Sequence, residues 1–249
     1  MPRRRFFIPP DRIRDGTAVL TPDQAHHLRD VLRLSTGEEV ELFDGEGQCY
    51  SGRVECRGAE IHIGSLKGLE PAEKRRTSLV LAAALLKADR FEWVLQKGTE
   101  LGVDRFLPLE THFSSVRIPS VRLEARLDRW QRIVREASKQ SRRLTVPRVQ
   151  PPLPFSALLA APEYAGCAGF MLHEKAPRRL RAVTPADRAL LCVGPEGGWD
   201  TAEAQAAEQA GFQVVSMGSR IMRAETAALA AVAVLQFLFE QQRLRDADL

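Results

Sequence analysis

The fold is decided by residues 192–200, which read Cys192-Val193-Gly194-Pro195-Glu196-Gly197-Gly198-Trp199-Asp200. An apolar run of strand length, residues 189–193, leads into this glycine-rich stretch, and a helical pattern at residues 201–210 follows it. Asp200 followed by Glu203 is typical of a helix N-terminus that carries a capping box. A strand, a glycine turn and a helix in this order predict one unit of a parallel α/β sheet.

The glycines of this turn allow two interpretations. Glycine lets the backbone approach a ligand closely, and ligands of open α/β sheets bind at the carboxyl ends of the strands. A tight strand-to-helix turn explains the same residues, and spacing alone favours that simpler interpretation. The stretch is not GxGxxG, and the sequence contains no GxxxxGK[ST] phosphate loop.

A second glycine turn, Met217-Gly218-Ser219-Arg220, follows the next predicted strand at residues 212–217. Two successive strand ends with small-residue loops predict one shared pocket. Arg223 and Glu225 stand directly before a very apolar helix at residues 225–242, where a buried charge is costly without a partner. They are therefore either pocket residues or surface charges of the helix end, and the helix dipole favours Glu225 there in both cases.

The rest of the chain divides into two textures. Residues 6–66 show short strands with tight turns, a hairpin signal at Asp44-Gly45-Glu46-Gly47 and one helical pattern at residues 22–33. From residue 77 onward strands alternate with helices, although prolines at residues 147–154 predict a break in regular structure. A charged stretch at residues 67–76 predicts a linker. We therefore expect a small β-barrel-like domain at residues 1–72 and an α/β domain at residues 73–249.

The predicted regular elements of the second region are strands at residues 78–86, 103–109, 168–172, 189–193 and 212–217, and helices at residues 89–101, 122–143, 201–210 and 225–242.

Composition excludes several classes of protein. The 249 residues are 44% hydrophobic and 27% charged, which is ordinary for a globular protein, and no apolar run reaches the roughly 20 residues that span a bilayer. Prolines interrupt the charged N-terminus, so we expect no signal peptide and a cytoplasmic location. The four cysteines form no pair with zinc-ligand spacing, and we predict no metal.

Charge is concentrated in the middle of the chain. Residues 74–148 hold 17 Lys and Arg against 8 Asp and Glu, whereas residues 1–70 hold 10 against 12. Such a basic segment is typical of a protein with a polyanionic partner. A solvated helix face explains a single charge run equally well.

Six blocks of residues stand in order along the whole chain. They are Arg5-Phe6-Phe7; His26-His27 with Val31-Leu32-Arg33 and Gly37; Lys87 with Gln96-Lys97 and Glu100-Leu101-Gly102-Val103; Glu136-Ala137 with Gln140-Ser141-Arg142-Arg143 and Pro147; Gly194-Pro195-Glu196-Gly197-Gly198; and Arg220-Ile221-Met222-Arg223-Ala224-Glu225-Thr226-Ala227. Together these blocks resemble the 16S rRNA (uracil-1498-N3)-methyltransferase family, whose catalytic domain has the SPOUT fold. The departures are mild, with Gly98, Lys139 and Met222 replacing common family residues without removing a reactive group.

The resemblance implies a PUA-like RNA-binding domain followed by a SPOUT-type parallel sheet with a C-terminal trefoil knot. It also implies a homodimer with active sites near the subunit interface, and a substrate that is the 16S rRNA of the assembled small ribosomal subunit. S-adenosyl-L-methionine would bind in the knot. The residues expected to hold this cofactor are Leu172, Gly194, Pro195, Glu196, Gly197, Met217, Gly218, Ile221, Met222, Arg223, Thr226 and Ala227.

The reaction needs either a base or a cation near the uracil. N3 must lose its proton before it can accept a methyl group, so the site removes that proton or stabilises the resulting anion. Arg223 is the first candidate for anion stabilisation. Glu225, Glu196 and Glu100 are candidate bases, and the sequence leaves the choice among them open. A sulfonium methyl donor needs no metal.

For the RNA, the sequence suggests two contact surfaces formed by Arg and His, which suit phosphate contacts and base stacking. Each of these residues taken alone is more often a solvated charge. The first surface comprises Arg3, Arg4, Arg5, His26, His27, Arg29 and Arg33, and the second comprises Arg142 and Arg143.

Three rival functions remain. A ribosome-assembly factor that lost its chemistry would have a degraded cofactor loop, but residues 194–198 and 223–227 are intact. A SPOUT enzyme acting on transfer RNA or another ribosomal site fits the blocks at residues 5–37 and 96–103 less well. A Rossmann-type methyltransferase would carry an early glycine-rich strand-to-helix turn, which this sequence lacks.

Overall fold

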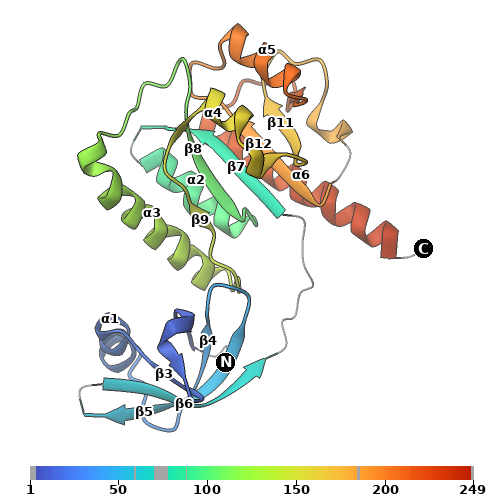
Figure 1. The fold of residues 1–249 in the computed structure, drawn as a ribbon. Coiled ribbons are helices and arrows are strands. Elements are labelled where there is room, and N and C mark those ends of the chain that lie inside the picture. Colours follow the sequence, from blue (N-terminus) through green and yellow to red (C-terminus); the bar gives the residue numbers. More distant parts are fainter. Residues whose placement is uncertain (1–3, 59, 70–77, 88, 184–185, 248–249) are drawn as a thin grey trace. The chain divides into compact units, whose positions relative to one another are not determined.

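The computed structural model describes residues 4–58, 60–69, 78–87, 89–183 and 186–247 (Figure 1). The chain forms two compact units, the first made of Met1–Lys74 with Ser138–Val146 and the second of Arg75–Ala137 with Pro147–Leu249. The predicted boundary, between residues 72 and 73, lies outside the described residues. The return of Ser138–Val146 to the first unit was not predicted.

The first unit is built on a mixed six-stranded sheet. Its order is β1-β4-β5-β6-β3-β2, and the pairings of the described residues do not join the two end strands. Alternation along β4 buries Val40 and Leu42 in the core. The predicted hairpin is confirmed, because Phe43 pairs with Cys49 across the turn. The strands are β1 (Arg4–Phe7), β2 (Ile13–Arg14), β3 (Thr17–Val19), β4 (Glu39–Phe43), β5 (Cys49–Arg57) and β6 (Glu60–Leu69).

Two predictions for this unit need correction. The predicted linker at residues 67–76 begins too early, since β6 continues to Leu69. The helical segment predicted at residues 22–33 starts as α1 (Pro22–His26) with a capping box from Thr21 and Gln24, but it continues as a π-helical turn at His27–Val31. Arg33 then takes the left-handed conformation, with φ of 53°.

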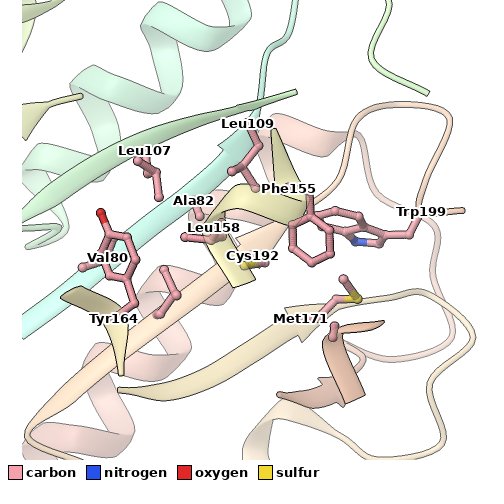
Figure 2. Close-up of a cluster of buried hydrophobic side chains, with 12 residues drawn as sticks. Val80, Ala82, Leu107, Leu109, Phe155, Leu158, Tyr164, Met171, Cys192 and Trp199 are labelled. Atoms are coloured by element: carbon pink, nitrogen blue, oxygen red, sulfur yellow. The ribbon is translucent and has the colours of Figure 1, made fainter. Parts of the chain in front are cut away.

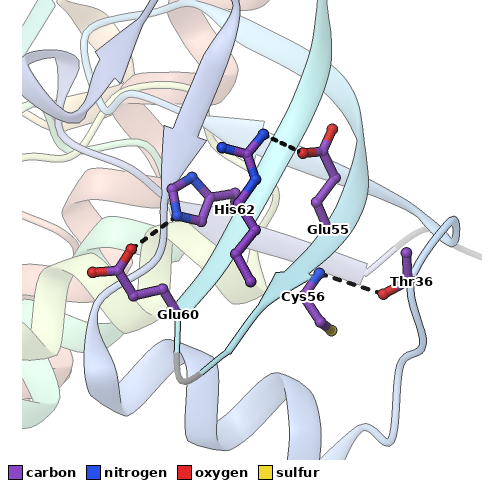
Figure 3. Close-up of polar contacts among 6 residues, drawn as sticks. Thr36, Glu55, Cys56, Glu60 and His62 are labelled. Atoms are coloured by element: carbon purple, nitrogen blue, oxygen red, sulfur yellow. Dashed lines mark hydrogen bonds and ion pairs between the residues drawn. The ribbon is translucent and has the colours of Figure 1, made fainter.

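The hairpin of β5 and β6 pairs its exposed charges locally (Figure 3). Arg57 lies 2.8 Å from Glu55 and His62 lies 2.9 Å from Glu60, while the backbone N–H of Cys56 donates to Thr36 Oγ1 at 3.3 Å. Exposed pairs of this kind contribute at most about 1 kcal/mol each. The buried core beneath the sheet therefore stabilises this unit more than its surface charges do.

The second unit is built on a seven-stranded parallel sheet, as predicted. The strand order is β10-β8-β7-β12-β11-β13, and β9 pairs with β8. A break was predicted around residues 147–154, but that stretch contains two short strands, and Pro154 caps a helix that was not predicted. The strands are β7 (Ser78–Ala84), β8 (Arg105–Glu110), β9 (Arg148–Val149), β10 (Leu153–Pro154), β11 (Ala168–Leu172), β12 (Arg188–Val193) and β13 (Gln213–Val215).

Helices cover both faces of this sheet, α4 and α5 on one face and α2 and α6 on the other (Figure 1). Val80 and Ala82 of β7 join Phe155 of α4 and Trp199 in one buried apolar cluster (Figure 2). On the other side, α3 packs on α2 through Phe91 and Trp130, whose rings are 4.8 Å apart. The helices are α2 (Asp89–Glu100), α3 (Ser120–Gln140), α4 (Phe155–Ala160), α5 (Thr201–Gln209) and α6 (Ala224–Ala247).

The trefoil knot stays a prediction, because the order of strands in a sheet does not by itself define how the chain is threaded. Within the described residues, no helix is both long and apolar enough to cross a membrane.

Candidate functional site

The carboxyl ends of three adjacent parallel strands form the candidate site. β11 lies between β12 and β13, so the two glycine turns emerge at one edge of the sheet, on either side of the end of β11. Trp199 Nε1 donates to the carbonyl of Leu172 at 2.9 Å, and the N–H of His173 donates to the carbonyl of Val215 at 2.8 Å. These bonds tie the turn after β12 and the end of β13 to the end of β11.

Different constraints require glycine in the two turns. A Cβ at Gly194 would lie 3.0 Å from the Trp199 indole, and one at Gly197 would lie 2.9 Å from Phe113 Cβ. Close packing therefore requires both residues. Gly218 has a φ of +134°, with no atom within 4 Å of the Cβ position, so backbone conformation rather than crowding favours glycine there.

An arginine of α2 links the turn after β12 to the start of α6, and no sequence pattern predicts this link. Arg90 Nη1 lies 3.1 Å from Glu196 Oε1, after β12, and Arg90 Nε lies 3.9 Å from Glu225 Oε1, in the first turn of α6. The other carboxylate oxygen of Glu225 is buried and has no hydrogen-bond partner among the described residues. One cation thus holds two acidic residues that come from segments far apart in the sequence.

Arg223 lies exposed immediately before α6. Its carbonyl accepts from the N–H of Ala227 at 2.8 Å, which fixes the backbone at the start of the helix. Within the described part of the chain, no ion pair or hydrogen bond engages its guanidinium. Glu225 faces Arg90, so the interpretation that Arg223 serves only to pair with Glu225 finds no support in this geometry.

Glu100 lies far from this group. It is the last residue of α2, about 15 Å along the helix from Arg90 at 1.5 Å per residue, and it accepts from Lys97 Nζ at 2.8 and 3.0 Å. Gln236 of α6 donates to the carbonyl of Gly102, directly after α2. The two helices therefore run side by side, with Arg90 near the start of α6 and the end of α2 near a later turn of α6. One chain does not bring Glu100 to Arg223 and Glu225.

The other predicted cofactor residues lie on the three strand ends. Leu172 is the last residue of β11, and the turns after β12 and β13 lie on either side of it. Ile221 is 89% exposed, which is unusual for a large apolar side chain in a turn. The remaining members follow β12 or β13, or lie in the first turn of α6: Pro195, Met217, Met222, Thr226 and Ala227.

The described residues of the two predicted RNA surfaces all belong to the first unit. Arg142 and Arg143 belong to the segment that joins this unit, so they lie beside Arg5 instead of forming a separate surface. Arg5 Nη2 donates to the carbonyl of Arg143 at 2.9 Å, and Arg142 lies 3.2 Å from Glu41. Arg3 lies outside the described residues.

Of the remaining members of that predicted surface, four lie in α1, in the turn that follows it or directly after that turn, whereas Arg4 lies in β1. His26 pairs with Asp30 at 2.6 Å, and His27 begins the π-helical turn. Arg4, Arg29 and Arg33 are exposed.

Arg5 is half-buried, and its contacts are those of a structural residue. Its guanidinium lies 4.3 Å from the centre of the Phe43 ring, and burial lowers the pKa of Arg5. We expect Arg5→Ala to lower the free energy of unfolding of this unit by about 1 to 3 kcal/mol, because a charged hydrogen bond and a cation–π contact are lost together. Thermal unfolding measures this loss. Exposed Arg4→Ala is the matched control, and equal melting temperatures for the two variants would contradict the prediction.

Comparison with known proteins agrees with this arrangement. A family model described as an RNA methyltransferase domain matches residues 73–236, and one described as an RNA methyltransferase PUA domain matches residues 20–55. The ribosomal RNA small subunit methyltransferase E of Synechocystis sp. is 34% identical to this chain over 244 residues, which cover 95% of this chain and 78% of that protein.

Two solved structures are similar over nearly the whole chain. A ribosomal RNA small subunit methyltransferase E from Neisseria gonorrhoeae, bound to S-adenosyl methionine, is 33% identical with a TM-score of 0.86, covering 96% of this chain and 98% of that chain. A putative methyltransferase from Legionella pneumophila, in complex with the bound cofactor SAM, is 28% identical with a TM-score of 0.85, covering 95% and 98%. The chain therefore belongs to the RNA methyltransferase family that includes the ribosomal RNA small subunit methyltransferases E.

Proposed function

We propose that this protein transfers a methyl group from S-adenosyl-L-methionine to N3 of a uridine, the family position 1498, in the 16S rRNA of the small ribosomal subunit. The observation that carries the proposal is the meeting of two glycine turns at one edge of a parallel sheet, next to Arg223 and the Arg90–Glu225 pair. Two relatives with the same fold bind this cofactor. A ribosomal substrate implies that the reaction takes place in the cytoplasm.

The residues of the site fit such a cofactor. Space is open around Gly218, Ile221 is exposed, and a buried oxygen of Glu225 has no partner among the residues that the structure describes. The turns of residues 194–197 and 217–222, with Leu172, Thr226 and Ala227, would hold the cofactor. When bound, it supplies an electrophilic methyl group on a sulfonium.

The protein's own chemistry concerns the uracil. Arg223, exposed and without a partner in the described chain, is free to place its planar guanidinium against a carbonyl oxygen that gains charge when N3 loses its proton. Of the three candidate bases, the geometry favours Glu225. One of its oxygens is buried without a partner among the described residues, and the other lies 3.9 Å from Arg90. Glu196 lies closer to Arg90, at 3.1 Å, and Glu100 lies 2.8 Å from Lys97.

The first unit would bind the RNA. Some of its exposed cations lie on or next to a π-helical turn and a left-handed Arg33, two backbone features that recur at functional sites. The residues we assign to this surface are Arg4, His26, His27, Arg29, Arg33, Arg142 and Arg143.

Arg90 would preorganise the cofactor site. We expect Arg90→Ala to weaken cofactor binding about ten-fold, because Glu196 and Glu225 then repel each other without a shared cation. Arg90→Lys should restore part of the affinity. Arg129→Ala removes a similar contact, a 2.7 Å pair with Glu92, and should leave the affinity unchanged. Calorimetric titration measures all three variants, and equal losses for Arg90→Ala and Arg129→Ala would defeat the assignment.

The protein would act as a homodimer. Large apolar side chains on α2 and α6 are exposed in the single chain, with Trp93 at 51% and Phe237 at 57%. We expect light scattering at micromolar concentration to give about twice the chain mass of 27.8 kDa. A mass equal to that of one chain would contradict the dimer.

Mass spectrometry of small-subunit RNA from cells that lack the protein tests the proposed function. We expect 3-methyluridine to be absent at the proposed position and to return with the wild-type gene, but not with one encoding Arg223→Ala. Unchanged 3-methyluridine would contradict the proposal. Loss of a different modified nucleotide would indicate the rival SPOUT activity on another RNA site.

A further inference from the structure

A groove of about 480 Å³ opens beside the candidate site, at the carboxyl ends of β8 and β10. Phe155 and Leu159 of α4 provide apolar lining, and Phe155 packs against Trp199, with ring centroids 4.8 Å apart. Charged and imidazole side chains come from Glu110 at the end of β8, from His112 and Arg117 in the loop that follows, and from Glu203 of α5. The volume falls within the range of small-molecule sites and is large enough for one nucleotide.

The loop beside the groove connects it to the cofactor turn. The N–H of His112 donates to Glu203 Oε1 at 2.9 Å, which fixes this loop to α5. The next residue, Phe113, packs against Gly197, where an added Cβ would lie 2.9 Å from its own Cβ. Because His112 lines the groove and Phe113 packs against Gly197, a ligand in the groove would lie close to the turn that we assign to the cofactor.

The polar groups of the groove suit a nucleotide. Among the described residues, neither the Glu110 carboxylate nor the Arg117 guanidinium has a hydrogen bond or ion pair, so both groups are available to a ligand. Apolar and imidazole surfaces stack on bases, a carboxylate accepts from an exocyclic amino group, and arginine binds phosphate.

We propose that this groove binds an RNA nucleotide next to the target uridine, and that this nucleotide carries an exocyclic amino group. Uracil has no such group, and its one donor on the pairing edge, N3–H, lies between two carbonyl oxygens that repel a carboxylate. The groove therefore discriminates against uridine and leaves the target base for the cofactor edge. The proposal rests on the proposed function, since it assumes an RNA substrate, and it adds a specificity site to it.

Two variants test the groove by direct binding, measured as the anisotropy of labelled single-stranded RNA. One RNA carries cytidine beside the uridine, and the other carries uridine at that place. We expect the wild type to bind the cytidine RNA about ten-fold more tightly, and Glu110→Gln and Leu159→Trp to remove this preference. Arg122→Gln, an exposed change on α3, is the matched control.

The same variants are measured in methylation of small subunits. KM should rise about ten-fold for Glu110→Gln and Leu159→Trp, whereas kcat and cofactor affinity should stay within two-fold of wild type. Equal binding of both RNAs by the wild type, or a preference that survives in both groove variants, would overturn the proposal. Binding without methylation in the wild type would instead count against the proposed function.

Discussion

Arg223→Ala is expected to lower single-turnover methylation by about a hundred-fold or more while leaving the fold and most cofactor affinity intact. Removing one hydrogen-bond donor to a developing oxyanion typically costs this much in rate. Arg223 is exposed and has no side-chain partner in the described chain, so truncation removes no contact that holds the protein together. Rapid-quench measurement with saturating cofactor isolates the transfer step from binding.

Two further variants separate catalysis from structure. Arg223→Lys should recover only part of the rate, because a point charge cannot reproduce the planar donor fork. Arg188→Ala, at the opposite end of β12, should keep the wild-type rate. A lowered melting temperature with a normal transfer rate for Arg223→Ala would end its catalytic assignment, and Glu225→Gln would then be the next variant to measure.

Gly218→Val and Gly197→Val are expected to weaken cofactor binding by more than ten-fold, for different reasons. A β-branched residue does not tolerate the φ of +134° at Gly218, so the turn after β13 must change shape. At Gly197 the new side chain collides with Phe113 and displaces the turn after β12. Calorimetric titration measures the affinity, and circular dichroism confirms that each variant is folded.

Gly68→Val is the matched control for these glycine variants. Gly68 has no close neighbour and no left-handed φ, and it lies in β6 of the first unit. Its replacement should leave cofactor affinity unchanged. Wild-type affinity in folded Gly197→Val and Gly218→Val would contradict the placement of the cofactor between the two turns.

Local sequence patterns predicted the elements whose signal lies within the element itself. The apolar run before residue 192 and the glycine turns after it predicted a parallel sheet, because a strand buried on both faces reads as a continuous apolar run. The hairpin at residues 44–47 could also be predicted, because all of its turn residues are adjacent in sequence. The family resemblance was needed to interpret the turns as a cofactor site.

Features that depend on long-range contacts were not predicted. Arg90 meets Glu196 and Glu225 only when α2 packs beside α6, and no local spacing reveals that meeting. Ser138–Val146 joins the first unit although most of α3 belongs to the second, because an amphipathic pattern does not show which unit covers the end of a helix. The sequence does not predict the short helix α4, because Pro154 suggests a break in regular structure, although proline is well tolerated at a helix start.

A reconstituted reaction tests directly whether the protein methylates N3 of a uridine in 16S rRNA. Purified protein, S-adenosyl-L-methionine with a deuterated methyl group and small subunits from cells lacking the protein are incubated together, and nuclease fragments of the RNA are then sequenced by mass spectrometry. We expect a single deuterated methyl group, on N3 of one uridine of the 16S rRNA. Label on a ribose, on another base or on no nucleotide at all would contradict it.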